Sequence, residues 1–307
     1  MSRIALLIRT HVLDDQVRAF VETMRRDPEF DLFAVVDESR GRIDFGDIPK
    51  IPLISDLPAE LGLYGQAPNQ FWRCGDYALY AARRMLPHYR AFWMIEPDVR
   101  INSSRPMGVL DRFPPPEDVD FLAGHLRLAE ADWNWGHTMD AAEGPIWRCL
   151  YSLIRISARA IDVLLAERRE ASRRFEEGGR DPEWWPNDEV FTASTLARRG
   201  LACRDFNDFG EIYDGVGFSY WLPVSEHDLA SSGREGWLYH PVLSGQRYFI
   251  KLFRIASQQG TLDRLDRVID ALIGTEWTEE EAVSHHRALE FARAQLRLDS
   301  DPTRLRA

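Results

Sequence analysis

The chain has 307 residues, of which 45% are hydrophobic, and a formal net charge of -11. This composition is ample for a folded core and unlike that of disordered chains. The negative balance argues against a protein that mainly binds nucleic acid, because neutralising phosphates needs an excess of Lys and Arg. No apolar stretch approaches the roughly 20 residues that span a bilayer. Three scattered cysteines without CxxC spacing indicate neither a disulfide framework nor a zinc site, so we expect a reducing, cytoplasmic setting.

The first forty residues have the pattern of a strand, a helix and a second strand. Ile4–Ile8 is a short apolar run of the kind that is buried in a parallel sheet, and it predicts a first strand, not a signal peptide. Apolar residues then recur at helical spacing from Val17 to Met24. Leu32–Val36 is the second apolar run, and Asp37 closes it. This order predicts a βαβ unit with a right-handed crossover.

The middle of the chain alternates in the same way. A Ser at 157 predicts the start of a further helix, and we expect the polar run 168–183 to be a frayed helix end followed by a mobile loop. The other elements expected here are a strand near Ile51–Ile54, a helix over Asp76–Met85, and strands over Ala91–Ile95, Phe121–Gly124 and 149–156.

The pattern changes past Val190. A helix is expected to about Arg199, then an irregular aromatic stretch through Tyr239, and then two or three carboxy-terminal helices. Alternating strands and helices followed by a helical remainder are typical of an α/β domain with an elaboration. We therefore expect a Rossmann-like, mostly parallel sheet flanked by helices over residues 1–242, and a helical extension over residues 243–307.

Polar residues follow each of the expected parallel strands. Arg9 and Thr10 come after the first, Asp37 after the second, and Glu96 and Asp98 after the run AFWMI. In open α/β sheets the ligand lies beyond the carboxyl ends of the strands, so these side chains are expected to converge on one edge.

Glu96-Pro97-Asp98 is the sharpest of these features. Two carboxylates at i and i+2 reach one site when the chain bends, and Pro97 favours such a bend. Hard cations such as Mg²⁺ and Mn²⁺ prefer carboxylate oxygens together with substrate phosphates. The other interpretation is a surface turn with two solvated acids, but a buried strand delivering both acids to the ligand edge favours a metal site.

Four segments of the chain form a pattern when they are taken together. In chain order they are WRCGDYALYAARRMLPHY (72–89), HYRAFWMIEPDVRI (88–101), WPNDEVFTASTLARRGL (185–201) and GWLYHPV (236–242). This pattern resembles the GT-A-fold glycosyltransferases, which use nucleotide-diphospho-sugars. The second segment resembles the strand and acidic motif of that family, in a variant with Glu in place of the more common first Asp. The other three are similar to the helix before that strand, to the acceptor-side acidic segment with its helix, and to the late segment with a His.

The resemblance spans roughly residues 3–242, and it implies a role for several positions. Asp98 would bind Mn²⁺ or Mg²⁺, Glu96 would bind the metal or the donor ribose, and His240 would be a further metal ligand. Asp188 or Glu189 would be the general base that deprotonates the acceptor hydroxyl. The nucleotide contacts that the resemblance implies are Arg9, Thr10, Asp37 and Asp76.

These roles agree with the chemistry of glycosyl transfer. Negative charge develops on the leaving diphosphate, so a metal or other cations must stabilise it. A carboxylate near the acceptor completes the reaction, and it favours single displacement with inversion, although retention stays open. Asn187, Asp188 and Glu189 also suit a helix start, where they would cap the first turn without any catalytic task.

The expected function is thus metal-assisted sugar transfer from a nucleotide-diphosphate donor to a carbohydrate or other hydroxyl acceptor. The alternative is a GT-A-like protein that has lost its chemistry and serves in binding or assembly. A sugar-nucleotide pyrophosphorylase is a third possibility, but RTHVLDD after the first strand lacks the Gly-rich basic loop that such enzymes usually carry. Trp133, Trp135, Trp184 and Trp185 would either line an acceptor groove or serve ordinary core and loop roles.

Overall fold

The computed structural model describes residues 4–26, 30–245, 247–248 and 250–252. The chain divides into two compact units, one through Ile212 and the other from Tyr213 onward.

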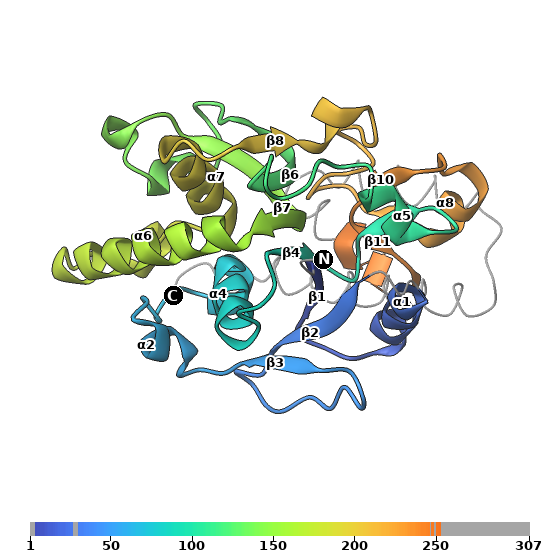
Figure 1. The fold of residues 1–307 in the computed structure, drawn as a ribbon, viewed down its shortest axis with the longest axis horizontal. Helices are drawn as coiled ribbons and strands as arrows, with labels where there is room; N and C mark the ends of the chain where they lie inside the picture. Colours follow the sequence, from blue (N-terminus) through green and yellow to red (C-terminus); the bar gives the residue numbers. More distant parts are fainter. Residues whose placement is uncertain (1–3, 27–29, 246, 249, 253–307) are drawn as a thin grey trace, which may run out of the picture. The chain divides into compact units, whose positions relative to one another are not determined.

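The first unit is built around a seven-stranded sheet with the order β3-β2-β1-β4-β7-β6-β8 (Figure 1). The sheet is mostly parallel. Only β7 runs against its two neighbours, β4 and β6, because a hairpin connection joins it to β6. The strands are β1 (Ile4–Thr10), β2 (Asp31–Asp37), β3 (Lys50–Leu53), β4 (Ala91–Ile95), β6 (Phe121–Leu128), β7 (Trp147–Ser157) and β8 (Cys203–Asp205), with a short β5 (Arg100–Asn102) outside the sheet.

Helices cover both faces of this sheet (Figure 1). The larger core cluster joins one face to α2, α4, α6 and α7, whereas α1 lies on the other side. The helices of the first unit are α1 (Asp15–Arg25), α2 (Leu57–Leu61), α3 (Gln70–Arg73), α4 (Asp76–Met85), α5 (Pro106–Leu110), α6 (Ala158–Glu177) and α7 (Asp188–Arg198), with 3₁₀ turns η1 (Gly136–Thr138), η2 (Ala141–Glu143), η3 (Pro182–Trp184) and η4 (Phe206–Phe209).

The predicted α/β architecture with a mostly parallel, helix-flanked sheet is confirmed. β1 and β2 pair in parallel across α1, as the expected βαβ unit requires. Helix α4 and strand β4 have the predicted bounds, and all five residues of β4 are buried. That strand is apolar throughout because it lies between β1 and β7 and is covered on both faces.

The prediction of a frayed helix end and a mobile loop over 168–183 is wrong for the helix, although a helix end and a loop do fall within this run. Helix α6 continues to Glu177, and Arg168, Ser172 and Phe175 are among its buried residues. The misleading signal was polarity: the run is rich in Arg and Glu, many of which pair along the exposed side of the helix. One side of a long helix can be buried even where its composition is polar.

The second unit contains β9 (Val224–Ser225), α8 (Glu226–Ser232), β10 (Trp237–Tyr239) and β11 (Val242–Leu243). β9 and β11 pair in parallel. The predicted carboxy-terminal helices fall mainly outside the described residues, so the division at residue 242 and the helical extension over 243–307 stay predictions.

Candidate functional site

The order of strands in the sheet reverses direction between β1 and β4. The chain builds β1, β2 and β3 outward to one side, and then returns to place β4 on the other side of β1. The carboxyl ends of two such strands border the crevice in which open α/β sheets bind their ligands. Arg9 belongs to the end of β1, and Glu96 follows β4 directly.

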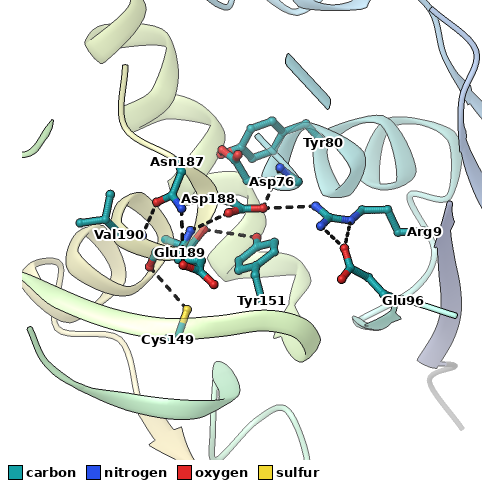
Figure 2. A network of polar contacts seen from close by, with 12 residues as sticks. Arg9, Asp76, Tyr80, Glu96, Cys149, Tyr151, Asn187, Asp188, Glu189 and Val190 are labelled. Atoms are coloured by element: carbon teal, nitrogen blue, oxygen red, sulfur yellow. Dashed lines mark hydrogen bonds and ion pairs between the residues drawn. The ribbon is translucent and has the colours of Figure 1, made fainter. Parts of the chain in front are cut away.

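Arg9 connects the two strand ends to helix α7, as Figure 2 shows. Its Nε donates a hydrogen bond to Oε1 of Glu96 at 3.0 Å, and its Nη2 contacts the same oxygen. Its Nη1 donates to Oδ2 of Asp188 at 3.2 Å. Burial disfavours the charged guanidinium, but the charges of Glu96 and Asp188 outweigh it and hold the pKa of Arg9 above its ordinary value. Arg9 is thus a fixed cation between two acids that lie 92 residues apart in the chain.

Asp188 is held in place by the start of its own helix and by the loop before α4. Asn187 caps α7 by accepting a hydrogen bond from the Val190 amide at 3.1 Å. Oδ1 of Asp188 accepts the amide of Glu189 at 2.8 Å, and Oδ2 accepts the amide of Gly75 at 2.9 Å. A Cβ at position 75 would lie 2.4 Å from Oδ2 of Asp188, so only glycine permits this close approach.

The two acids at the start of α7 have raised pKa values. Burial is the main cause for Asp188, and with the charge of Asp76 it outweighs Arg9 and raises the pKa to about 7. Burial and the neighbouring charge of Asp188 raise the pKa of Glu189 to about 8. A carboxylate that titrates near neutrality is suited to accept a proton from a substrate.

Asp76, a predicted nucleotide contact, is fully buried and is paired with Arg168, not with Arg9. Its two oxygens accept hydrogen bonds from Nε and Nη2 of Arg168 at 2.8 and 3.0 Å, and Tyr80 donates to it at 2.8 Å. Arg168 also donates to the carbonyl of Pro186, directly before Asn187. The pair therefore fixes the turn that leads into α7. A contact between Asp76 and a nucleotide stays a prediction.

Glu96 and Asp98 belong to one turn, because the amide of Val99 donates to the carbonyl of Glu96 at 3.0 Å. Pro97 occupies the second position of that turn, where its fixed φ is favourable. Both acids are half-buried. The expected bend after AFWMI is thus present, and it keeps both carboxylates at the end of β4.

The other predicted strand-end residues have local partners. The Thr10 hydroxyl donates to the carbonyl of Val12 at 2.8 Å, and Asp37 accepts from the amide and the hydroxyl of Ser39. Both side chains stabilise the loops that follow their strands. The nucleotide contacts that were expected of Thr10 and Asp37 stay predictions.

His240 lies in the second unit and is 7% exposed. Its Nδ1 is 2.6 Å from the carbonyl oxygen of Ser219. When Nδ1 donates to that carbonyl, Nε2 keeps its lone pair, which is the arrangement that a metal-ligating His usually has. That His240 joins Glu96 and Asp98 around one metal ion stays a prediction from the sequence.

Sequence reasoning missed Arg168 and Gly75. Arg168 stands in a run of charged residues that looks solvated, so nothing in the sequence marks it as buried. The sequence did indicate Gly75, because it directly precedes Asp76 at the start of a helix. A glycine at such a position lets the backbone approach another group closely.

A scan against protein-family models finds no match, and a search of curated proteins finds no similar sequence. Within the described part of the chain, no helix has both the length and the apolar character to cross a membrane.

Proposed function

We propose that this protein is a glycosyltransferase of the GT-A type, which moves a sugar from a nucleotide-diphosphate donor to an acceptor hydroxyl. The observation that carries the proposal is the Arg9 bridge between Glu96, at the switch point of the sheet, and Asp188, at the start of α7. Sugar transfer needs a donor site and an acceptor base side by side. The bridge connects two features: the strand end, which is where open α/β sheets bind ligands, and the pair of acids with raised pKa values.

Glu96 and Asp98 are the proposed metal ligands of the donor site. Their carboxylates suit a hard cation such as Mn²⁺ or Mg²⁺. Because Arg9 occupies Oε1 of Glu96, a metal ion would use the other oxygen of Glu96 together with Asp98. A bound metal would stabilise the negative charge that develops on the leaving diphosphate. His240 is proposed as a third ligand on the sequence resemblance.

Arg9 is the proposed diphosphate contact from the chain itself. Three of the five N–H groups of its guanidinium take part in the contacts with Glu96 and Asp188. The raised pKa keeps the group charged throughout the physiological range. A permanent cation held by two acids is preorganised, so it stabilises a leaving phosphate without rearranging.

Of the two acids at the start of α7, we assign the general base to Glu189. Both oxygens of Asp188 accept backbone amides, and its side chain is only 6% exposed. Glu189 is half-buried and thus more accessible, although its carboxylate lies 3.5 Å from Nδ2 of Asn187 and also accepts a backbone hydrogen bond from Tyr151. Asp188 would then position Arg9, while Glu189 takes the proton of the acceptor hydroxyl.

The proposed reaction is a single displacement. The acceptor oxygen attacks the anomeric carbon as its proton passes to Glu189, and the bond from that carbon to the diphosphate oxygen breaks. Attack opposite the leaving group inverts the anomeric centre. A carboxylate within reach of the acceptor is what this route requires.

Calorimetric titration with UDP and GDP in the presence of Mn²⁺ tests the donor site. We expect one of the two nucleotides to bind the full chain, and Asp98→Ala to weaken that binding at least tenfold, which corresponds to about 1.4 kcal/mol. Asp162→Ala is the matched control, because Asp162 is an exposed acid paired with Arg83. It should bind like the parent chain, and thermal unfolding should show that both variants are folded.

Two results would contradict the proposal. If neither nucleotide binds at millimolar concentration with Mn²⁺ present, the chain has no donor site of this kind, and the binding or assembly alternative gains support. If a nucleotide binds equally well to Asp98→Ala, the acidic turn after β4 is not the metal site.

A further inference from the structure

The connection between β6 and β7, residues 129–146, carries three aromatic side chains at a defined edge of the sheet. β7 runs antiparallel to β4, and β6 antiparallel to β7, so β6 and β4 point the same way. The connection therefore leaves the sheet at the edge where β1 and β4 end, which is the edge of Arg9 and Glu96. Trp133, Trp135 and His137 lie in this connection.

Two of these rings lie against arginine side chains of the first unit. The guanidinium of Arg73 is 4.9 Å from the ring centre of Trp135, and that of Arg148 is 5.1 Å from the ring centre of Trp133. Arg73 is 3% exposed, while both tryptophans are half-buried. Each ring thus has a cation on one side and retains area that is open to solvent. The cation–π contacts also hold the rings at fixed positions.

A third tryptophan extends this surface toward the acids of α7. Trp184 is 50% exposed, and its ring packs edge-to-face on His137 with the centroids 5.0 Å apart. It lies four residues before Asp188. Arg73 ties the parts together, because its Nε donates to the carbonyl of Trp185 at 3.0 Å while its guanidinium faces Trp135.

Strand β7 connects the same surface to Glu189. Cys149 donates from Sγ to the carbonyl of Glu189 at 3.4 Å. The positive charge of Arg148, whose guanidinium lies over the ring of Trp133, favours the ionised form of Glu189. The aromatic rings and the acid pair are therefore parts of one region of the first unit.

We propose that Trp133, Trp135 and Trp184 form the acceptor subsite, and that the acceptor is a carbohydrate whose sugar rings stack on these tryptophans. The C–H faces of a pyranose carry partial positive charge and complement the negative face of an aromatic ring. The polar surroundings, among them Asn134, Asp132 and Glu183, supply groups for the hydroxyls. An aliphatic acceptor would gain from the rings but would not use these polar groups.

This inference rests on the proposed transferase function, because it names the acceptor of that reaction. It is nevertheless tested without the donor. Maltotriose, cellotriose, xylotriose and tri-N-acetylchitotriose are the probes, and saturation-transfer NMR with calorimetry measures their binding to the full chain. We expect at least one of them to bind with a dissociation constant in the millimolar range or below.

Variants of Trp184 locate the subsite. Trp184→Ala should weaken trisaccharide binding at least tenfold, whereas Trp184→Phe keeps an aromatic face and should retain most of it. Trp221→Ala, which removes a tryptophan of similar exposure in the second unit, should bind like the parent chain. Because Trp184 is half exposed, its removal should leave the fold intact, and thermal unfolding checks this.

Three outcomes would overturn the inference. The first is that none of the four trisaccharides binds the parent chain, and the second is that one binds equally well to Trp184→Ala. The third is binding of octanoate without any saccharide, which would make the rings a surface for an apolar partner. Donor hydrolysis, in which water replaces the acceptor, reports on the proposed function separately. If donor hydrolysis is observed together with any of these outcomes, the proposed transferase function is retained and the acceptor is not a carbohydrate bound at these tryptophans.

Discussion

Two groups of acidic side chains lie close together in the first unit, and their negative charges are compensated in different ways. Asp76 and Arg168 are both fully buried, and they face one another through two hydrogen bonds. At the start of α7, Asp188 shares the single cation Arg9 with Glu96, and Glu189 lies beside it. The first group is balanced in charge, whereas in the second the three acids outnumber Arg9 and Arg148, the cations that act on Asp188 and Glu189.

The difference separates a structural task from a chemical one. A balanced, fully hydrogen-bonded pair is inert over the physiological range and fixes its neighbours, here the Pro186 turn and Tyr80. Where acidic side chains outnumber cations and are shielded from water, their pKa values rise toward neutrality, as they do for Asp188 and Glu189. This arrangement lowers the stability of the fold, but it provides groups that can exchange protons. The three predictions below address each side of this comparison in turn.

The largest expected effect comes from breaking the balanced pair. Arg168→Met should lower the free energy of unfolding by about 3–5 kcal/mol, because it leaves the carboxylate of Asp76 buried without its cation. Urea denaturation measures the loss. Arg173→Met is the control, since Arg173 pairs with Glu170 and Glu177 on the exposed side of the same helix, and it should change stability by about 0.5 kcal/mol or less.

A double variant sharpens this prediction. Asp76→Leu combined with Arg168→Met replaces both charges with apolar side chains, and it should be more stable than Arg168→Met alone. If the single variant is as stable as the parent chain, or if the double variant is less stable than the single one, the pair does not have the structural role that its geometry indicates.

A smaller effect is expected from Gly75, which permits the contact between Arg9 and Asp188. A Cβ at this position would lie 1.5 Å from Nη1 of Arg9. Gly75→Ala should therefore displace Arg9, cost about 1–3 kcal/mol of stability and reduce donor hydrolysis on the order of a hundredfold. Gly108→Ala is the control, because its added Cβ would meet only ordinary contacts, the nearest at 3.6 Å. Hydrolysis that is unchanged in Gly75→Ala would show that the Arg9 bridge is dispensable.

The architecture could be predicted for those elements whose own sequence contains the periodic spacing of apolar residues. Runs such as AFWMI and the helical spacing from Val17 to Met24 gave β4 and α1 because burial imposes a period on each element. The second half of α6 could not be predicted in this way. Its buried face includes Arg168 and Ser172, whose partners lie about a hundred residues away in the chain.

The candidate site was predictable in its residues but not in its connections. Strand ends pointed to Arg9, Glu96 and Asp98, and the helix start pointed to Asp188 and Glu189. That Arg9 links Glu96 to Asp188 depends on tertiary packing, and no spacing in the sequence encodes it. Asp76 illustrates the same limit, because only the position of Arg168 decides that its carboxylate is buried and paired.

The smallest expected effect concerns the pH dependence of the unbalanced group. The folded pKa of Glu189, about 8, lies above its value in the unfolded chain, so between roughly pH 4.5 and pH 8 the folded chain binds more protons. Stability contributed by this group is therefore present below pH 4.5 and is lost as the pH rises toward 8. Glu189→Gln cannot ionise, so it should be more stable than the parent chain at pH 8 and nearly equal to it at pH 4.5. The full difference in pKa corresponds to roughly 4 kcal/mol at pH 8, and solvent screening of this half-buried side chain should reduce it to about 1–2 kcal/mol.

Activity should change in the opposite direction, and this separates a base from a passive buried acid. Sugar transfer requires the ionised form of Glu189, so the rate of the parent chain should rise with pH and reach half its maximum near pH 8. Glu189→Gln should lose most of the rate at every pH while gaining stability at pH 8. Asp188→Asn should instead disturb the Arg9 contact and lower the affinity for nucleotide. A Glu189→Gln variant that keeps the parent's rate and pH profile would transfer the role of base to Asp188, because that acid alone would then combine a raised pKa with a place on the Arg9 bridge.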